Sequence, residues 1–277
     1  MSKRSRRGLR APFGLALFTF VFIAGTIAAS AQTPFVPYYN KNRIKYDHFH
    51  WHTYTTDHFE IYYYPEIEQH LERIASYAES AYQQISADLK HDLAFKIPLI
   101  LYKTESEFQQ QNIDPGEVPE GVLAFAEPYR DRMVLPIDQP SDELYHLITH
   151  EMTHIFEFDI IPRTLLRRGL PLWVDEGLAD FETGDWNPFD LMTVRDAAIA
   201  DIVPPMSDFQ PQAFVDGRTP YNMGHACFEF IESKWGKEGI RQFMFALRKS
   251  VIGGGESAYE EAFKLKPDEF DEQFDST

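Results

Sequence analysis

Cysteine is nearly absent from this chain, because Cys227 is the only one among 277 residues. A disulfide within the chain is therefore excluded, and so are metal sites built from several thiolates. The stability of the fold must come from its hydrophobic core, together with any metal that other residue types hold.

Basic residues are also scarce. Lysine and arginine total 26 residues against 43 aspartates and glutamates, which gives a formal net charge of −17. Five of the basic residues fall within the first ten positions, so the chain after residue 31 carries −22. We do not expect such an acidic chain to bind nucleic acid or anionic lipid through its overall field. The carboxylates are spread along the chain, as on a solvated surface.

The chain lacks an apolar run of typical membrane-spanning length. Its longest apolar stretch, residues 13–28, follows a basic start and precedes the small residues Ala29, Ser30 and Ala31. This pattern predicts a signal peptide over residues 1–31, cleaved after Ala31, and export to the periplasm or the cell exterior. No cysteine follows the cleavage site, so a lipoprotein anchor is not indicated. The alternative is that residues 1–31 stay uncleaved and anchor the chain in a membrane. If the signal peptide is cleaved, we expect no stable membrane insertion of the remaining chain.

The 246 residues after the signal peptide suit one compact enzyme domain or two small lobes. A lead segment rich in proline, tyrosine and asparagine covers residues 32–55. The predicted domain covers residues 56–274, with a sheet-rich lobe at about 56–140 and a helical lobe at about 141–274. Residues 269–277 resemble a helix cut short, either because the chain is a piece of a longer protein or because they form its tail.

Hydrophobic periodicity places strands early and helices late, with no internal repeat and no low-complexity run. The predicted strands are residues 58–64, 95–102, 122–126 and 132–137, with a hairpin turn near 128–131. The predicted helices are residues 66–93, 105–111, 141–161, one around Glu176, 189–202, 221–235, 239–248 and 257–263. This order indicates the α+β class.

Two histidines lie one helical turn apart in the sequence His-Glu-Met-Thr-His, residues 150–154. Residues at i and i+4 share one face of a helix, so His150 and His154 can hold one zinc ion. Glu151 then lies next to the open coordination position, where it can act as a general base. The alternative is that His150 and His154 are ordinary core or surface histidines, and that the sequence matches the zinc-binding pattern by chance.

The residues around this motif predict a buried and uninterrupted helix. Apolar residues recur at the helical spacing, and neither proline nor glycine interrupts residues 141–161. Ser141 is the expected N-cap, and acidic residues follow it in the first turn. His146 lies one turn before His150 and could replace a ligand, but it would then displace the glutamate pattern.

A second motif follows in residues 172–181, which read Leu-Trp-Val-Asp-Glu-Gly-Leu-Ala-Asp-Phe. Glu176 can supply a third ligand from the next helix. Asp180 lies one turn further and can accept a hydrogen bond from the free ring nitrogen of a ligand histidine. Two histidines and one glutamate leave one coordination position open, as in catalytic zinc sites. We therefore predict one Zn²⁺ per chain. The alternative for Glu176 is a solvated position on the surface of its helix. The alternative for Asp180 is a role as a helix cap or in another ion pair.

The pattern His-Glu-x-x-His followed by Glu-Gly-x-Ala-Asp resembles the gluzincin metallopeptidases, which include thermolysin and the aminopeptidase N family. It resembles more closely the bacterial exported peptidase MA-like domains, often found ahead of β-propeller repeats. The resemblance covers roughly residues 56–274. It implies a zincin-like fold, with a small mixed or antiparallel sheet, an edge strand over the cleft, an active-site helix and a mainly helical C-terminal half. A propeller or other C-terminal domain is implied only for longer relatives.

The resemblance implies two further sites. An edge strand that binds extended substrate would consist of Val122, Leu123, Ala124, Phe125 and Ala126. Residues 220–224, Pro-Tyr-Asn-Met-Gly, match the Tyr-x-x-Gly whose tyrosine donates a hydrogen bond to the oxyanion, so Tyr221 is implied as the transition-state stabiliser. His225, one turn later, is the rival donor. The glutamate-rich motif that captures a free amino terminus is not found, which puts exopeptidase activity in doubt.

Together these features predict an exported zinc-dependent metallopeptidase that acts on peptides or proteins. Zinc and Tyr221 would stabilise the oxyanion while Glu151 moves the proton. One alternative is a zinc-containing module that binds peptide or serves as a scaffold in a larger exported protein, without turnover. Another is hydrolysis of an ester or other non-peptide substrate.

Overall fold

The computed structural model describes residues 48–113, 122–161, 170–184, 186–209, 217–253 and 257–276. The expected signal peptide and most of the lead segment lie outside these ranges. All described residues fall within one compact unit. Within them, each helix is too short or too polar to cross a membrane.

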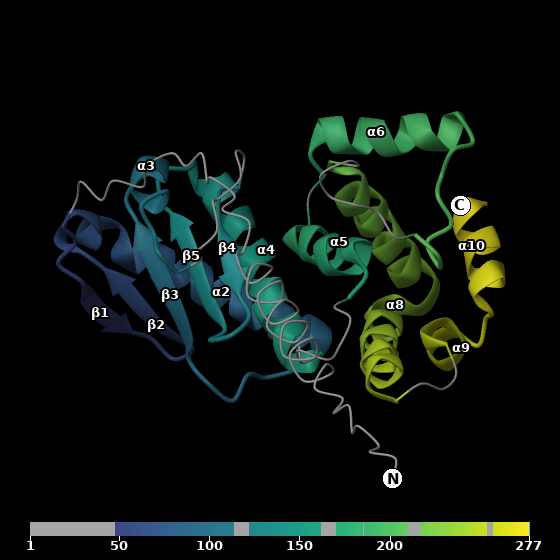
Figure 1. Ribbon diagram of the computed structural model, residues 1–277, viewed down its shortest axis with the longest axis horizontal. Helices are drawn as coiled ribbons and strands as arrows, with labels where there is room; N and C mark the ends of the chain where they lie inside the picture. Colours follow the sequence, from purple (N-terminus) through teal and green to yellow (C-terminus); the bar gives the residue numbers. More distant parts are fainter. Residues whose placement is uncertain are drawn as a thin grey trace, which may run out of the picture. The chain divides into compact units, whose positions relative to one another are not determined.

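The described residues contain one mixed sheet (Figure 1). Its strands are β1 (His52–Thr55), β2 (Phe59–Tyr63), β3 (Ile97–Tyr102), β4 (Phe125–Glu127) and β5 (Arg132–Pro136), in the spatial order β1-β2-β3-β5-β4. The three central strands run parallel, and the two outer strands run antiparallel to their neighbours. Parallel neighbours need a long crossover, which a helix between β2 and β3 supplies.

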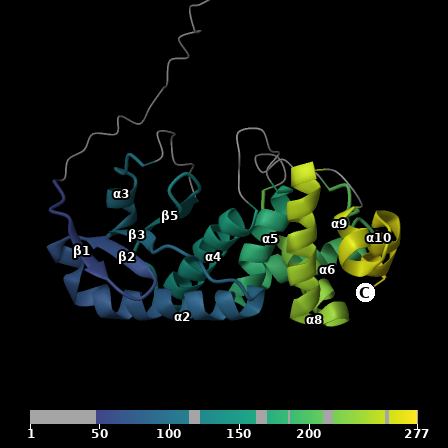
Figure 2. The ribbon, with the colours of Figure 1, turned by 90° about the horizontal axis from the view of Figure 1, so that it is seen from below.

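The helices are η1 (Pro65–His70), α2 (Leu71–Leu89), α3 (Glu105–Phe108), α4 (Ser141–Ile160), α5 (Leu172–Thr183), α6 (Pro188–Ile199), α8 (Thr219–Gly253), α9 (Ala258–Phe263) and α10 (Pro267–Asp275). All the described strands precede α4, and only helices follow it. The predicted α+β class is therefore confirmed. In both views α4 lies between the sheet and the C-terminal helices (Figures 1 and 2).

The two faces of the sheet follow the alternation of side chains along its strands. Leu99 and Leu101 of β3 belong to the main core, which they share with residues of α2 and α4. Ile100 and Tyr102 point to the other face and pack with Phe108 of α3 in a small second cluster. Helices α2 and α4 therefore cover one face of the sheet, and α3 covers part of the other.

Two helices cross at a point of backbone contact. A Cβ atom added at Gly177 of α5 would lie 2.4 Å from Gly224 Cα of α8, and one added at Gly224 would lie 2.1 Å from the Trp173 carbonyl oxygen. Only glycine at both positions allows this approach. The crossing brings the expected third ligand on α5 close to the tyrosine motif at the start of α8.

The break expected between residues 235 and 239 is present as a kink. Gly236 has φ 65° and ψ −176°, which is outside the helical region, so α8 consists of two helical segments joined there. The turn between β4 and β5 also lies where it was predicted, with Asp131 at φ 49°.

Three details of the sequence interpretation are corrected. Ser141 is not the N-cap of α4: Pro140 occupies that position, and the Ser141 hydroxyl instead accepts a hydrogen bond from Arg73 Nη1 at 2.9 Å. The edge strand begins at Phe125, three residues later than predicted. Strand β1 was not predicted, because its four residues are all exposed and show no alternation.

Candidate metal centre

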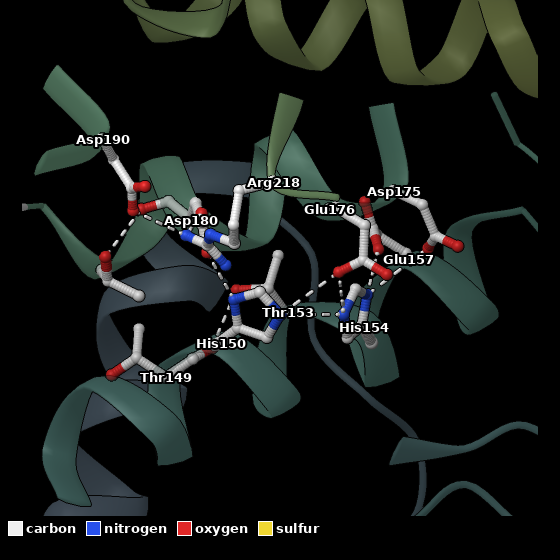
Figure 3. Close-up of polar contacts among 11 residues, drawn as sticks. Thr149, His150, Thr153, His154, Glu157, Asp175, Glu176, Asp180, Asp190 and Arg218 are labelled. Atoms are coloured by element: carbon white, nitrogen blue, oxygen red, sulfur yellow. Dashed lines mark hydrogen bonds and ion pairs between the residues drawn. The ribbon is translucent and has the colours of Figure 1, made fainter. Parts of the chain in front are cut away.

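Three donor atoms converge where α4 faces α5 (Figure 3). The Nε2 atoms of His150 and His154 are 3.3 Å apart. Glu176 Oε2 lies 3.4 Å from His150 Nε2 and 3.5 Å from His154 Nε2. The three predicted ligands are therefore close enough to hold one metal ion.

Carboxylates behind the two imidazoles orient them. His150 Nδ1 lies 2.9 Å from Asp180 Oδ1, which is the contact that the sequence predicted. His154 Nδ1 lies 2.9 Å from Glu157 Oε2 and 3.4 Å from Asp175 Oδ1. With each Nδ1 facing a carboxylate, each Nε2 is left to face the centre.

Glu157 and Asp175 were missed by the sequence interpretation. Glu157 lies three residues after His154 on the same helix, a spacing that could have pointed to it. With His154 Nδ1 these two carboxylates form a second group compact enough for a cation. The short Glu157–His154 contact favours a hydrogen bond, so we interpret the pair as support for His154.

Burial and charge act against each other at the centre. Burial disfavours the charged form of His150, but Asp180 and Glu176 outweigh it and raise the pKa of that imidazole to about 9. Burial would raise the pKa of Glu176, but hydrogen bonds from His150 and His154 hold it well below its usual range. A metal must displace the histidine protons, so binding at this centre weakens as pH falls.

Glu151 lies beside the ligands and is only 6% exposed. Burial raises the pKa of its carboxyl, and a hydrogen bond from the backbone of Ala126 opposes that shift. Because Ala126 belongs to β4, this bond ties the expected general base to the edge strand.

Tyr221 and Arg218 complete one side of the centre. The Tyr221 ring lies parallel to that of His150, with centroids 6.3 Å apart, and its side chain hydrogen-bonds Glu176. Burial, then the charge of Glu176, raises the pKa of Tyr221, so the phenol keeps its proton.

Arg218 Nη2 donates to Asp180 at 2.8 Å and to Asp190 at 3.0 Å, with the guanidinium 4.4 Å from the Tyr221 ring centre. Nothing in the sequence pointed to Arg218.

Among the described residues, neither of the two other histidines considered belongs to a group that could hold a metal ion. His225 is buried and stacks on Trp186 at 3.9 Å between ring centroids. His146 belongs to neither group of the described residues that could share a metal ion. Of the two expected oxyanion donors, Tyr221 is the one that contacts a ligand residue.

A cleft of about 730 Å³ opens beside His150 and Glu151. Val122, Leu123 and Ala124 line one wall, whereas Phe125 and Ala126, also expected to bind substrate, belong to β4 and are not among the lining residues. Another part of the cleft is lined by Trp186, which precedes α6, and by Phe189 in the first turn of α6.

A comparison with protein-family models found no model that matches the chain, and a comparison with curated proteins found no similar protein. We therefore interpret the site from the chemistry and geometry of its own residues.

Proposed function

We propose that this protein is an exported zinc-dependent metallopeptidase of the gluzincin type, with a zincin-like fold. The observation that supports this most strongly is the triangle of donor atoms on His150, His154 and Glu176, with sides of 3.3 to 3.5 Å. Tetrahedral zinc with bonds of about 2.0–2.1 Å has ligands about 3.4 Å apart. Two imidazoles and one carboxylate also match zinc in ligand type.

The proposed reaction is hydrolysis of a peptide bond. Zinc, when bound, supplies a Lewis acid that polarises the carbonyl and activates water near neutral pH. Glu151 takes the proton of the attacking water and delivers it to the leaving amine. Tyr221 donates its phenolic hydrogen to the oxyanion, a role whose loss costs about 10²–10³ in rate at comparable sites.

The chain around the centre supports this assignment of roles. The cleft gives substrate access to the face of His150 that also carries Glu151 and Tyr221. The segment before β4 lies along the cleft at the edge of the sheet, where an extended peptide can add as a further strand.

The test is metal content and hydrolysis of a broad peptide library, for the wild type and Glu151→Gln. We expect one zinc per chain in both proteins, and hydrolysis only in the wild type. Gln242→Glu, on a helix face away from the cleft, is the control for a change of one charge and should retain activity. If wild type and Glu151→Gln bind peptide equally and neither cleaves it, a binding module replaces the enzyme. No zinc in either protein after zinc is supplied would refute the centre.

A further inference from the structure

Carboxylates outnumber guanidinium groups in the lining of the cleft, with four of them on Glu143, Glu151, Asp180 and Asp190 and one guanidinium on Arg218. The lining also includes three imidazoles, those of His146, His150 and His225. Arg218 is already bonded to both Asp180 and Asp190. Glu143 is exposed on the first turn of α4. The chain as a whole also carries −17, so its field adds to the local charge.

An apolar surface continues outward from the cleft along α6. Phe189, which lines the cleft, is 75% exposed, and Met192 and Ile199 of the same helix are 53% and 84% exposed. Their spacing of three and seven residues places them on one face of the helix. Ile202, just beyond the helix, is 69% exposed. In Figure 1, α6 lies above the start of α8, the helix that it contacts.

A buried acceptor also lies in the cleft wall. Asn222 lines the cleft and is almost fully buried, and its Oδ1 has no hydrogen-bond partner among the described residues. A buried carbonyl oxygen without a donor is costly, by about 1–3 kcal/mol in typical proteins. An N–H group of a bound molecule would satisfy it.

We propose that the substrates are cationic amphipathic peptides, which bind with basic groups over the acidic cleft and apolar side chains along α6. This inference rests on the proposed function, because it names the substrate class of the same site. The charge of the lining selects against acidic peptides, and the exposed face of α6 needs an apolar partner to leave water.

The geometry sets the length of peptide that can use both surfaces. The 12 residues of α6 extend over about 18 Å, which an extended peptide covers with about six residues. A peptide of about 12 residues can therefore occupy the cleft and α6 together. A peptide of four residues can occupy only one of them.

The experiment measures binding to zinc-loaded Glu151→Gln, so that turnover does not interfere. The probes are a 12-residue peptide of lysine and leucine, the same peptide with every lysine changed to glutamate, and a four-residue lysine–leucine peptide. We expect the lysine peptide to bind at least about tenfold more tightly than the glutamate peptide, with an affinity that falls as salt rises.

Two variants in the same background locate the contacts. Ile199→Ser combined with Ile202→Ser should weaken binding of the 12-residue peptide about tenfold and leave the four-residue peptide unaffected. The matched control is Tyr54→Ser, which changes an exposed apolar residue on β1, at the opposite edge of the sheet from β4. Glu143→Gln should weaken binding of the lysine peptide and not of its glutamate counterpart.

The outcomes separate this inference from the proposed function. Equal affinity for the lysine and glutamate peptides, or no effect of the α6 double variant, would overturn the substrate class. If the wild type cleaves other peptides meanwhile, the enzyme stands without this preference. If Glu151→Gln binds as expected but the wild type cleaves nothing, the binding surface stands and the peptidase does not.

Discussion

At the scale of single residues, Glu176 is the proposed metal ligand on α5, close to the two histidines of α4. Replacing it with alanine removes one of three donors, so we expect Glu176→Ala to lose most of its zinc affinity and to remain folded. Metal analysis and circular dichroism of the purified variant measure both properties. Glu272→Ala, on the exposed side of α10, is the control and should bind zinc as the wild type does. Full zinc content in Glu176→Ala would show that the ligand is another group.

Asp180 acts through His150, whose Nδ1 it contacts at 2.9 Å. Loss of such a carboxylate typically costs about 10- to 100-fold in metal affinity or activity. We expect Asp180→Ala to fall in this range, because His150 loses its orientation and Arg218 keeps only Asp190. Competition with a chelating dye measures the zinc affinity. An unchanged affinity would mean that Asp180 serves mainly to hold Arg218.

Glu182, on α5 away from the ligands, should make stability depend on pH. Its side chain is buried, and burial, followed by the charge of Asp88, raises its pKa from 4.5 to about 8. The folded protein therefore holds this proton more tightly than the unfolded chain. The contribution of this proton to the free energy of unfolding is therefore complete below pH 4.5, and it is lost as the pH rises through 8.

Glu182→Gln removes the titrating group, so its stability should not show this part of the decline. Relative to the wild type, the variant should gain up to about 4 kcal/mol in unfolding free energy as pH rises across that window. Urea unfolding at pH 5 and pH 8 measures the change. Parallel pH profiles for the two proteins would contradict the raised pKa.

At the scale of elements, the contact between α5 and α8 positions the centre. Gly224→Ala places a methyl group 2.1 Å from the Trp173 carbonyl oxygen, so the helices must separate. We expect a loss of about 1–3 kcal/mol in stability, typical of overpacking. Zinc affinity should fall as well, because Gly177 on the facing helix is next to Glu176.

The control for this prediction is Gly184→Ala. Gly184 has φ 86° and no atom within 4 Å of an added Cβ, so alanine strains the backbone without moving a helix. It should lower stability and leave zinc affinity unchanged. If both variants keep wild-type zinc affinity, the helix contact does not set the ligand geometry.

The elements that the sequence predicted are those with a strong local pattern. Helix α4 was placed to within one residue at each end, because its apolar stripe is continuous. Strand β1 is held by its pairing with β2, a distant partner that no local pattern reveals. The N-cap of α4 was wrong because Ser141 bonds Arg73, which lies 68 residues earlier in the chain.

The candidate site was predictable where its spacing follows the helix repeat. His150, His154, Glu176 and Asp180 come together as expected because each pair lies one turn apart on one helix face. Arg218 approaches Asp180 only after α5 and α8 cross, so tertiary packing alone brings it to the site. The glycines of both motifs were visible in the sequence, but their mutual contact was not.

At the scale of the whole molecule, the metal is expected to add stability to a domain that folds without it. The main core extends from the sheet through α2, α4, α5 and α8, far beyond the three ligands. Ion pairs of His150 with Asp180 and of His154 with Glu157 hold the histidines without a metal. We therefore expect the domain to stay folded without metal, unlike small zinc domains, which unfold when the metal is removed.

Zinc bound to the folded chain shifts its stability by mass action, by about 4.1 kcal/mol when free zinc is 1,000 times Kd. For a domain of this size that corresponds to about 8–16 °C in Tm. We expect a chelator to lower Tm by this amount, to abolish hydrolysis and to leave the circular dichroism at 25 °C unchanged. Glu176→Ala should show no response to the chelator. Complete unfolding of the wild type at 25 °C would mean that the metal holds the fold together. A wild-type Tm that does not respond would mean that no metal binds there.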